Sequence, residues 1–206
     1  MNKKMFLASA FSDVATLLPD FEPNLVGKKV TFIPTASKVE FIGFLVGLEK
    51  RTFKKLGLIV DELDLSKSST EEIETKINNN DLIYISGGNT FYLLQELKRT
   101  GADRIIIDAV NSGKLYIGES AGSVITAPNI EYISLMDSVK KAPELTNFDA
   151  LNLIDIYTLP HYKSSPFKKV TKNIVNEYSS KINLRSITNQ QVILVEGNQF
   201  TVQSAK

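Results

Sequence analysis

The sequence predicts an α/β fold in which a mainly parallel, doubly wound sheet carries helices on both faces. Short apolar runs typical of buried strands alternate along the chain with segments of helical pattern. Three motifs with candidate functional residues also follow such runs directly, at the strand ends where ligands of these sheets bind. With 206 residues, 43% of them hydrophobic, the chain can bury one substantial core. We therefore expect one domain over residues 1–206.

The strands are expected where short apolar runs stand between polar or turn-forming residues. These runs are residues 5–8, 29–33, 57–60, 82–85, 115–117, 154–157 and 191–195. Near the C-terminal end, Gly197 and Asn198 suit a tight turn, so residues 192–202 are expected to form a β-hairpin.

The helices are expected between these strands, over residues 38–56, 70–77, 91–99, 103–111 and 168–179. The second helix has a clear start, because Ser69 is followed three residues later by Glu72, which is the spacing of a capping box. Asn78, Asn79 and Asn80 tolerate left-handed backbone angles, which predicts that this helix stops there.

Charge and cysteine content exclude several classes of protein. The chain has 24 basic and 23 acidic residues, which argues against a dedicated surface for nucleic acid or for an anionic membrane. It has no cysteine, so disulfides, thiolate metal sites and a cysteine nucleophile are excluded. No apolar run approaches membrane-spanning length, and the first residues resemble a strand more than a signal peptide. We expect a cytoplasmic protein.

A strand, a sharp turn and a helix start fall within ten residues around Ser120. The run Gly118-Glu119-Ser120-Ala121-Gly122 follows an apolar segment and has the Gly-x-Ser-x-Gly pattern of a nucleophile elbow. In such a turn the serine is held at strained angles, and the glycines let strand and helix approach each other. A chance match in a loop is the alternative, but the flanking strand and helix patterns favour the elbow.

His161 is the single histidine of the chain and follows Ser120 by 41 residues. A serine hydroxyl near neutral pH is a poor nucleophile unless a base takes its proton, and imidazole is the usual base. A lone histidine is more often structural than catalytic. The elbow and the position of His161 after a predicted strand favour the catalytic interpretation.

A third motif, Ser86-Gly87-Gly88-Asn89-Thr90, follows the predicted strand at 82–85. Paired glycines at a strand end let backbone N–H groups approach a ligand, which could supply part of an oxyanion hole. The same residues also suit an ordinary strand-to-helix turn, with Asn89 or Thr90 as the helix N-cap.

Together the three motifs resemble the peptidase E family of serine peptidases, which includes aspartyl dipeptidases and cyanophycinases. The similarity runs over about residues 80–162. It implies that Ser120 is the nucleophile, that His161 is the base, and that the backbones of Gly88 and Ala121 form the oxyanion hole. It also implies a flavodoxin-like sheet, similar to that of class I glutamine amidotransferases.

The family's third triad member is an acid between the serine and the histidine. The resemblance points to Asp137, which lies 17 residues after Ser120, with Glu131 as the rival. Such an acid would hold the imidazole in its useful tautomer and stabilise the imidazolium. A solvated loop aspartate is the alternative reading of Asp137.

Substrate recognition departs from the family pattern. The dipeptidases carry an arginine-bearing stretch after the histidine, whereas this chain has no arginine between Arg104 and Arg185. Lys163 lies in that neighbourhood, but an ammonium is a point charge and lacks the planar fork of a guanidinium. Glu119 stands where the dipeptidases often have tryptophan and would disfavour an acidic substrate.

The leading hypothesis is a serine peptidase of short peptides that needs no cofactor or metal and is a monomer or homodimer. The residues expected to contact substrate are Asn89, Thr90 and Lys163. One alternative is a carboxylesterase with the α/β-hydrolase fold, because its elbow has the same pattern. The other is a non-catalytic binding or regulatory protein on the same scaffold.

Overall fold

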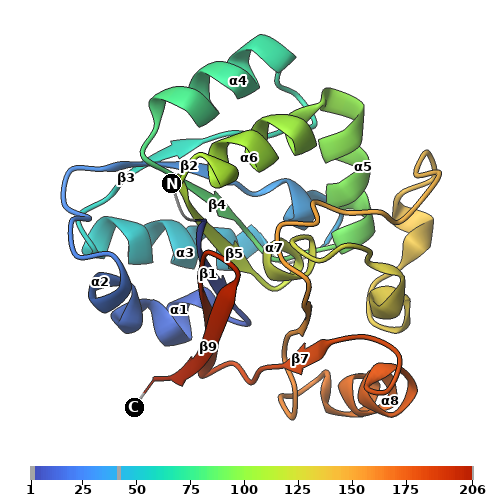
Figure 1. Cartoon of the computed structure of the whole chain (residues 1–206). Coiled ribbons are helices and arrows are strands. Elements are labelled where there is room, and N and C mark those ends of the chain that lie inside the picture. Colours follow the sequence, from blue (N-terminus) through green and yellow to red (C-terminus); the bar gives the residue numbers. More distant parts are fainter. Residues whose placement is uncertain (1–2, 41–42, 206) are drawn as a thin grey trace.

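A computed structural model describes residues 3–40 and 43–205 (Figure 1). Within these ranges a seven-stranded sheet has the order β3-β2-β4-β5-β1-β8-β9. The first five strands of the chain run parallel, and β8 and β9 add an antiparallel hairpin next to β1. The bounds are β1 Lys4–Ala8, β2 Lys29–Ile33, β3 Ile59–Glu62, β4 Leu82–Ile85, β5 Leu115–Glu119, β8 Gln191–Glu196 and β9 Gln199–Ser204. The predicted fold class is confirmed.

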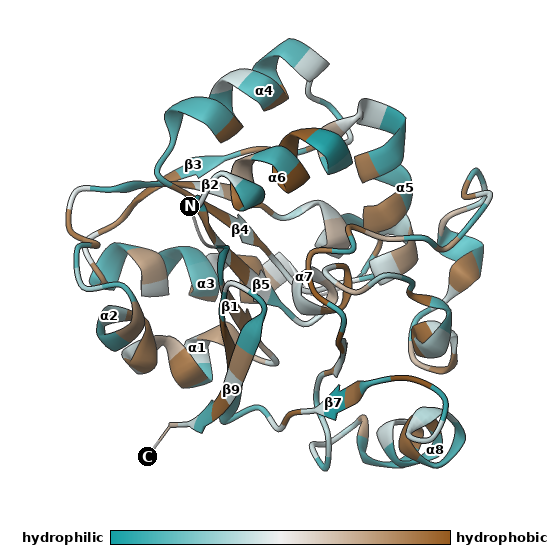
Figure 2. Cartoon of the chain, viewed as in Figure 1, coloured by the Kyte–Doolittle hydropathy of each residue, from teal (hydrophilic) through white to brown (hydrophobic). Residues whose placement is uncertain are grey.

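Helices cover both faces of this sheet (Figure 1). One face packs against α1 (Phe11–Val14), α2 (Leu18–Phe21) and α3 (Gly43–Lys55). The other packs against α4 (Thr70–Asn79), α5 (Thr90–Thr100), α6 (Ala102–Asn111) and α7 (Ala121–Val124). Each face therefore has its own apolar cluster, and Figure 2 shows hydrophobic strands between helices such as α4 that are hydrophilic on the outside.

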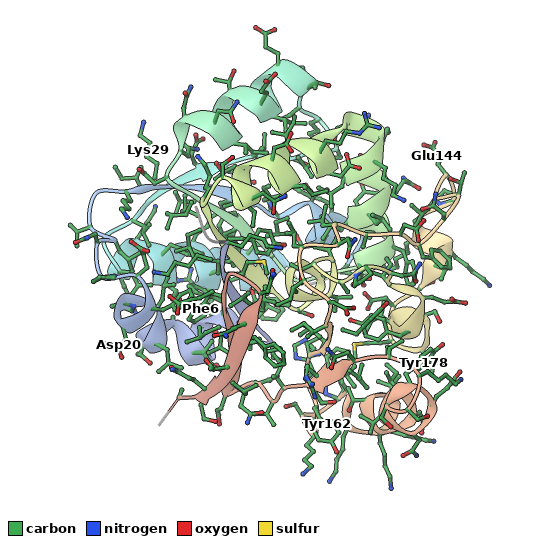
Figure 3. The ribbon with its side chains drawn as sticks, viewed as in Figure 1. Phe6, Asp20, Lys29, Glu144, Tyr162 and Tyr178 are labelled. Carbon is green, nitrogen blue, oxygen red and sulfur yellow. The ribbon has the colours of Figure 1, made fainter. Side chains whose placement is uncertain are left out.

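The sheet interior is dry and aromatic on the α1–α3 side. Phe11 stacks on Phe53 with ring centroids 4.5 Å apart, and Tyr84 lies 4.8 Å from Phe53. Figure 3 shows Phe6 among the interior side chains, whereas the exposed residues Asp20 and Glu144 lie at the periphery together with Lys29, Tyr162 and Tyr178. No helix in the described part of the chain is long and apolar enough to cross a membrane.

A small second layer lies beside the sheet and carries part of the candidate site. It consists of β6 (Tyr157–Leu159), paired in parallel with β7 (Leu184–Ser186), and of α8 (Lys168–Tyr178). The sequence predicted a strand at 154–157 within the main sheet, and this was wrong in position and in partner. β1 is already paired on both sides by β5 and β8, so β6 forms a separate two-stranded sheet.

Two helix predictions were also inexact. The expected helix over 38–56 is divided: a 3₁₀ segment, η2 (Thr35–Val39), ends before Glu40, which is extended, and α3 begins at Gly43. Helix α4 begins as predicted, with the Ser69 hydroxyl accepting a hydrogen bond from Glu72 N. It ends at Asn79, but Asn80 is extended with φ −85° and ψ 157°, so the expected left-handed stop is wrong. Two further 3₁₀ segments, η3 (Glu131–Leu135) and η4 (Val139–Lys141), follow α7.

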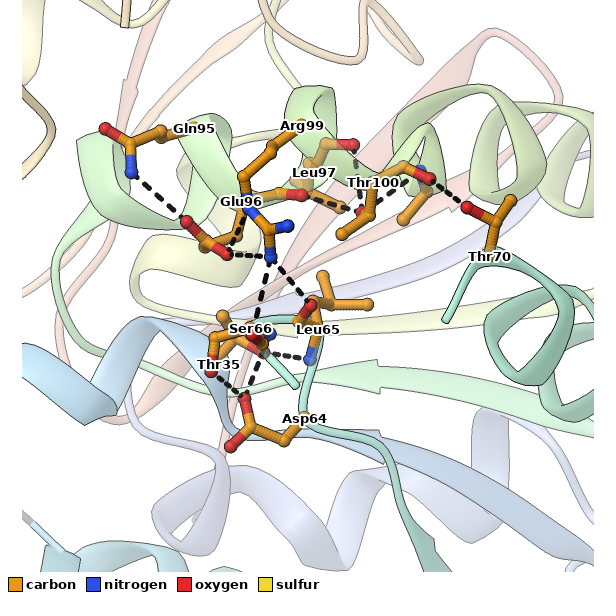
Figure 4. A network of polar contacts seen from close by, with 11 residues as sticks. Thr35, Asp64, Leu65, Ser66, Thr70, Gln95, Glu96, Leu97, Arg99 and Thr100 are labelled. Carbon is orange, nitrogen blue, oxygen red and sulfur yellow. Dashed lines mark hydrogen bonds and ion pairs between the residues drawn. The ribbon is translucent and has the colours of Figure 1, made fainter. Parts of the chain in front are cut away.

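Helix α5 is fixed by a polar network at its C-terminal end (Figure 4). Arg99 pairs with Glu96 at 2.7 Å and donates to the carbonyls of Leu65 and Ser66 in the loop after β3. The hydroxyl of Thr35 accepts from Leu65 N, which ties the same loop to η2. Because α5 follows the glycine pair of β4, this network holds the loop that faces Ser120.

Candidate active site

The carboxyl ends of β1, β4 and β5 meet at one edge of the sheet and border a cavity of about 400 Å³. His161 and Phe167 enclose it from the second layer, and α3 contributes another wall. The lining residues are Ser9, Glu40, Leu45, Glu49, Gly87, Gly88, Glu119, Ser120, Met136, Asp137, His161, Pro166 and Phe167.

Ser120 sits in the predicted elbow between β5 and α7. Its backbone angles, φ 47° and ψ −107°, are strained for a residue with a side chain. The glycines are required by close approach: a Cβ on Gly122 would lie 2.1 Å from Ile85 O, and one on Gly118 would lie 2.4 Å from Gly122 O. Ser120 N donates to Ala8 O at 3.0 Å, which ties the elbow to the end of β1.

The loop between β4 and α5 faces the serine. A Cβ on Gly87 would lie 3.3 Å from Ser120 Cβ, so this backbone borders the hydroxyl closely. Gly88 has φ 141°, and a Cβ there would lie 2.1 Å from Ala36 O. Only glycine fits this position, where the chain passes between η2 and the cavity. Asn89 then caps α5 by accepting from Tyr92 N, as one of the two predicted caps.

The structure brings His161 onto the serine. Nε2 of the imidazole lies 2.9 Å from Ser120 Oγ, a hydrogen-bond distance. His161 follows β6 and has a positive φ of 59°, and its ring stacks on Phe167 with centroids 4.8 Å apart. Its backbone N donates to the hydroxyl of the buried Ser9 at 2.7 Å. The ring is thus held from both the main sheet and the second layer.

An amide, not a carboxylate, contacts the far side of the imidazole. Asn189 Oδ1 lies 2.9 Å from His161 Nδ1 and also accepts from the Ser9 hydroxyl at 3.0 Å. With its proton given to Asn189, Ser9 can only accept from Nδ1, which lies 3.2 Å away. In this arrangement Nδ1 carries the ring proton, and the lone pair of Nε2 faces Ser120.

Burial lowers the pKa of His161 below its usual range, because the imidazolium loses hydration in the protein interior. The hydrogen bond with Asn189 and the negative charge of Glu119 oppose this effect and raise the pKa. The first cause is the largest, so the neutral ring is the form present near neutral pH. A neutral imidazole facing a hydroxyl can accept its proton.

Asp137 does not contact the histidine, so the expected Asp137–His161 pairing is corrected. Its Oδ2 accepts from Thr90 N at 2.8 Å and from Thr90 Oγ1 at 2.6 Å, on another wall of the cavity. Burial raises the pKa of Asp137 to about 6, and the two Thr90 hydrogen bonds oppose this shift. The rival, Glu131, is exposed at the first residue of η3. The position next to Nδ1 is occupied by Asn189 because the chain returns there between β7 and β8.

The residues expected to contact substrate also lie differently from the prediction. Lys163 is exposed, and its ammonium sits 5.3 Å from the ring centroid of Tyr162 rather than lining the cavity. Asn89 and Thr90 are each 1% exposed and build the wall: Asn89 donates to Ser138 O, and Thr90 holds Asp137. Their side chains support the cavity and do not face its interior.

The cavity is acidic. Four of its lining residues carry carboxyl groups, and no lysine or arginine of the described chain is among them. Glu119 is held on both oxygens, by Phe11 N at 2.9 Å and by the hydroxyl of Tyr84. Burial, together with Glu119 and Glu49, raises the pKa of Tyr84, which therefore stays a donor. Within residues 3–40 and 43–205, no group of three His, Cys, Asp or Glu could hold a metal ion.

Ser9 and Asn189 were missed from sequence. They lie 111 residues before and 69 residues after Ser120, and neither belongs to a recognisable motif. One signal was present for Ser9: it directly follows the strand at 5–8, so it was expected at the same edge of the sheet as the elbow. No comparable signal exists for Asn189, which is placed by the turn between two short strands.

Comparison with known proteins gives consistent results. A family model described as peptidase family S51 matches residues 5–203. An uncharacterized peptidase of Listeria monocytogenes is 56% identical over 197 residues, covering 96% of each chain. An uncharacterized peptidase of Pasteurella multocida is 51% identical over 193 residues, covering 94% of this chain and 93% of that protein. Peptidase E of Shigella sonnei is 30% identical over 149 residues, covering 72% of this chain and 62% of that protein.

Solved structures show the same architecture. The crystal structure of a Listeria monocytogenes protein provisionally assigned as peptidase E has a TM-score of 0.96 at 53% identity, over the full length of both chains. A peptidase from an acI-B1 Actinobacterium has a TM-score of 0.76 at 20% identity, over 100% of this chain and 88% of that one. The second similarity extends to the fold alone.

Proposed function

This chain belongs to peptidase family S51, and from that membership we propose that it is a serine peptidase that hydrolyses short peptides. The observation that carries the proposal is the 2.9 Å contact between His161 Nε2 and Ser120 Oγ at a strained elbow. The family match over residues 5–203 favours this function over a carboxylesterase of the α/β-hydrolase fold. The paired serine and histidine favour it over a non-catalytic binding protein.

The proposed reaction begins with proton transfer. His161 Nε2 takes the hydroxyl proton of Ser120 as Oγ attacks the carbonyl carbon of the scissile bond. The imidazolium then donates that proton to the leaving amine, the C–N bond breaks, and an acyl-serine remains. Water, deprotonated by the same imidazole, attacks the acyl carbon and releases the acid with Ser120 restored.

The oxyanion of the tetrahedral intermediate needs hydrogen-bond donors that are already in place. We assign this role to the backbone N–H groups of Gly88 and Ala121, following the family motif. Gly88 lines the cavity beside Ser120, and Ala121 is the first residue of α7, where an N–H has no intrahelical acceptor. Removal of one such donor typically costs about 2.7 to 4 kcal/mol of transition-state stabilisation.

Asn189 takes the third position of the proposed triad. Its oxygen fixes the tautomer of His161, but it brings no negative charge to the imidazolium. Glu119 supplies charge through space, since it raises the pKa of His161. This division of labour favours a base that is active at mildly acidic pH over one that is strongly basic.

The substrate is proposed to be a dipeptide or another short peptide, because the cavity of about 400 Å³ has room for few residues. Four carboxyl groups and no lysine or arginine among its described lining residues make recognition of an acidic side chain unfavourable. Cytoplasmic location and the monomeric or dimeric state remain predictions.

The test is hydrolysis of a panel of dipeptides and tripeptides that vary in their N-terminal residue. We expect cleavage of neutral peptides and no better cleavage of Asp-X peptides, measured as kcat/KM. Ser120→Ala should abolish cleavage, whereas the control Ser112→Ala, at an exposed position after α6, should retain it. Hydrolysis that persists in Ser120→Ala would refute the proposal, and so would the absence of any cleaved peptide in the panel.

A further inference from the structure

Glu49 is a buried acid that the proposed reaction does not use. It lies on α3, is 5% exposed and lines the same cavity as Ser120. Its Oε2 is buried and has no hydrogen-bond partner among the described residues. A buried carboxyl oxygen without a partner is costly, so such an atom calls for an explanation.

The other carboxyl groups of the cavity are accounted for. Glu119 is held by Phe11 N and Tyr84, Asp137 by Thr90, and the Glu40 carboxylate by Lys141 at 2.7 Å. Their placement follows from contacts within the protein. Glu49 therefore stands apart from them, because part of its hydrogen-bonding capacity remains directed to nothing else that the structure describes.

The cavity wall around Glu49 is apolar. Leu45 precedes it by one helical turn and faces the same cavity, and Met136 and Phe167 line other walls. Apolar walls that lead to a carboxylate match a long aliphatic side chain with a cationic end, as in lysine or arginine. A short cation close to the peptide backbone would leave these walls without a partner.

We propose that Glu49 forms a subsite for a basic side chain of the peptide substrate, with Leu45 contacting the aliphatic stem and Glu49 Oε2 accepting from its ammonium or guanidinium. This proposal rests on the peptidase function proposed above. The favoured residue is the one that supplies the scissile carbonyl, because Glu119 of the same cavity directly precedes the nucleophile.

The protonation state of Glu49 agrees with this role. Burial and the adjacent carboxylate of Glu119 raise the pKa of Glu49 to about 9. Without a cation beside it, the group is therefore held neutral near pH 7, in a state that avoids a second buried negative charge. A bound ammonium would favour the ionised form, because its positive charge compensates both carboxylates.

The experiment compares two peptides of nearly equal shape, Lys-Leu and norleucine-Leu. We expect the wild-type protein to favour Lys-Leu by about 10- to 100-fold in kcat/KM, the range of a charge-assisted hydrogen bond in a buried site. In Glu49→Gln this preference should fall to near unity while norleucine-Leu is cleaved as before. Glu40→Gln removes a carboxylate that Lys141 already neutralises, so it should keep most of the preference.

A second readout does not depend on catalysis. Calorimetry on Ser120→Ala should show tighter binding of Lys-Leu than of norleucine-Leu, and addition of Glu49→Gln should remove the difference. Glu49→Leu should also raise the melting temperature of the free protein by at least about 2 °C, because it removes an unpartnered buried oxygen.

Equal cleavage and equal binding of the two peptides would overturn the subsite. So would an equal loss of preference in Glu40→Gln and Glu49→Gln, which would indicate a general field of the cavity, or a preference that depends only on a free amino terminus. Cleavage of norleucine-Leu without a lysine preference would leave the peptidase function standing. Binding without any cleavage would refute that function while the calorimetry still decides the subsite.

Discussion

At the scale of single residues, the candidate site differs from its sequence-based expectation in one position that changes the chemistry. An acid was expected behind His161, and Asn189 is there instead. A carboxylate at this position would stabilise the imidazolium by its charge, whereas an amide oxygen only orients the ring. The base therefore depends on burial and on the more distant Glu119 for its pKa.

This arrangement predicts the pH dependence of the wild-type protein and of Asn189→Asp. Activity requires neutral His161, whose pKa lies below its usual value of about 6.5, so kcat/KM should rise with pH and be half-maximal below pH 6.5. A carboxylate at position 189 would favour the protonated ring and should move that midpoint upward by about 1 to 3 units. The profiles should be measured on a neutral dipeptide.

The control for this experiment is Glu131→Gln, which removes the exposed acid that was the rival third member. Its midpoint should match that of the wild-type protein. A midpoint that stays in place in Asn189→Asp, or that moves in Glu131→Gln, would contradict the assignment of Asn189 to the imidazole.

At the scale of elements, the strand-to-helix turns were the best predicted parts of the chain. The elbow around Ser120 could be read from sequence because a glycine on each side is a steric requirement, seen here as backbone contacts of 2.1 and 2.4 Å from a Cβ on Gly122 or Gly118. The Ser69 cap and the hairpin turn between Glu196 and Gln199 were equally local and equally predictable.

Elements whose position depends on distant contacts were not predictable in the same way. β6 has an apolar pattern suited to the main sheet, but its partner is β7, because both sides of β1 are already occupied. The break between η2 and α3 leaves no gap in the helical pattern of 38–56. In both cases the sequence pattern was compatible with two structures, and packing decided between them.

The elbow geometry predicts a large effect of Gly122→Ala. The added methyl would meet Ile85 O at 2.1 Å, so α7 would have to move away from β4. We expect a loss of about 1 to 3 kcal/mol in the free energy of unfolding and a loss of activity, because Ser120 moves with α7. Chemical denaturation and peptide cleavage measure the two effects.

Gly47→Ala is the matched control for this change. Gly47 lies within α3, where the nearest atom to a Cβ is Arg51 Nη1 at 3.6 Å. Alanine there should stabilise the protein by about 0.5 to 1 kcal/mol through helix propensity. Gly122→Ala with wild-type stability and activity would disprove the close approach of α7 and β4.

At the scale of the whole molecule, the site is assembled from five segments that are far apart in the sequence. Ser9 follows β1, the glycine pair follows β4, Ser120 follows β5, His161 follows β6, and Asn189 precedes β8. Parallel topology explains why the first three meet, since carboxyl ends of parallel strands share an edge. The last two are brought in by the second layer, which the sequence did not predict.

The account depends above all on an activated hydroxyl at Ser120, and covalent labelling tests this most directly. A fluorophosphonate probe should add once to the protein, with the adduct mapped to Ser120 by peptide mass spectrometry. Labelling should be absent in Ser120→Ala, unchanged in Ser112→Ala, and slowed by at least about 100-fold in His161→Ala. Failure to label Ser120, or a labelling rate in His161→Ala equal to that of the wild-type protein, would contradict the account.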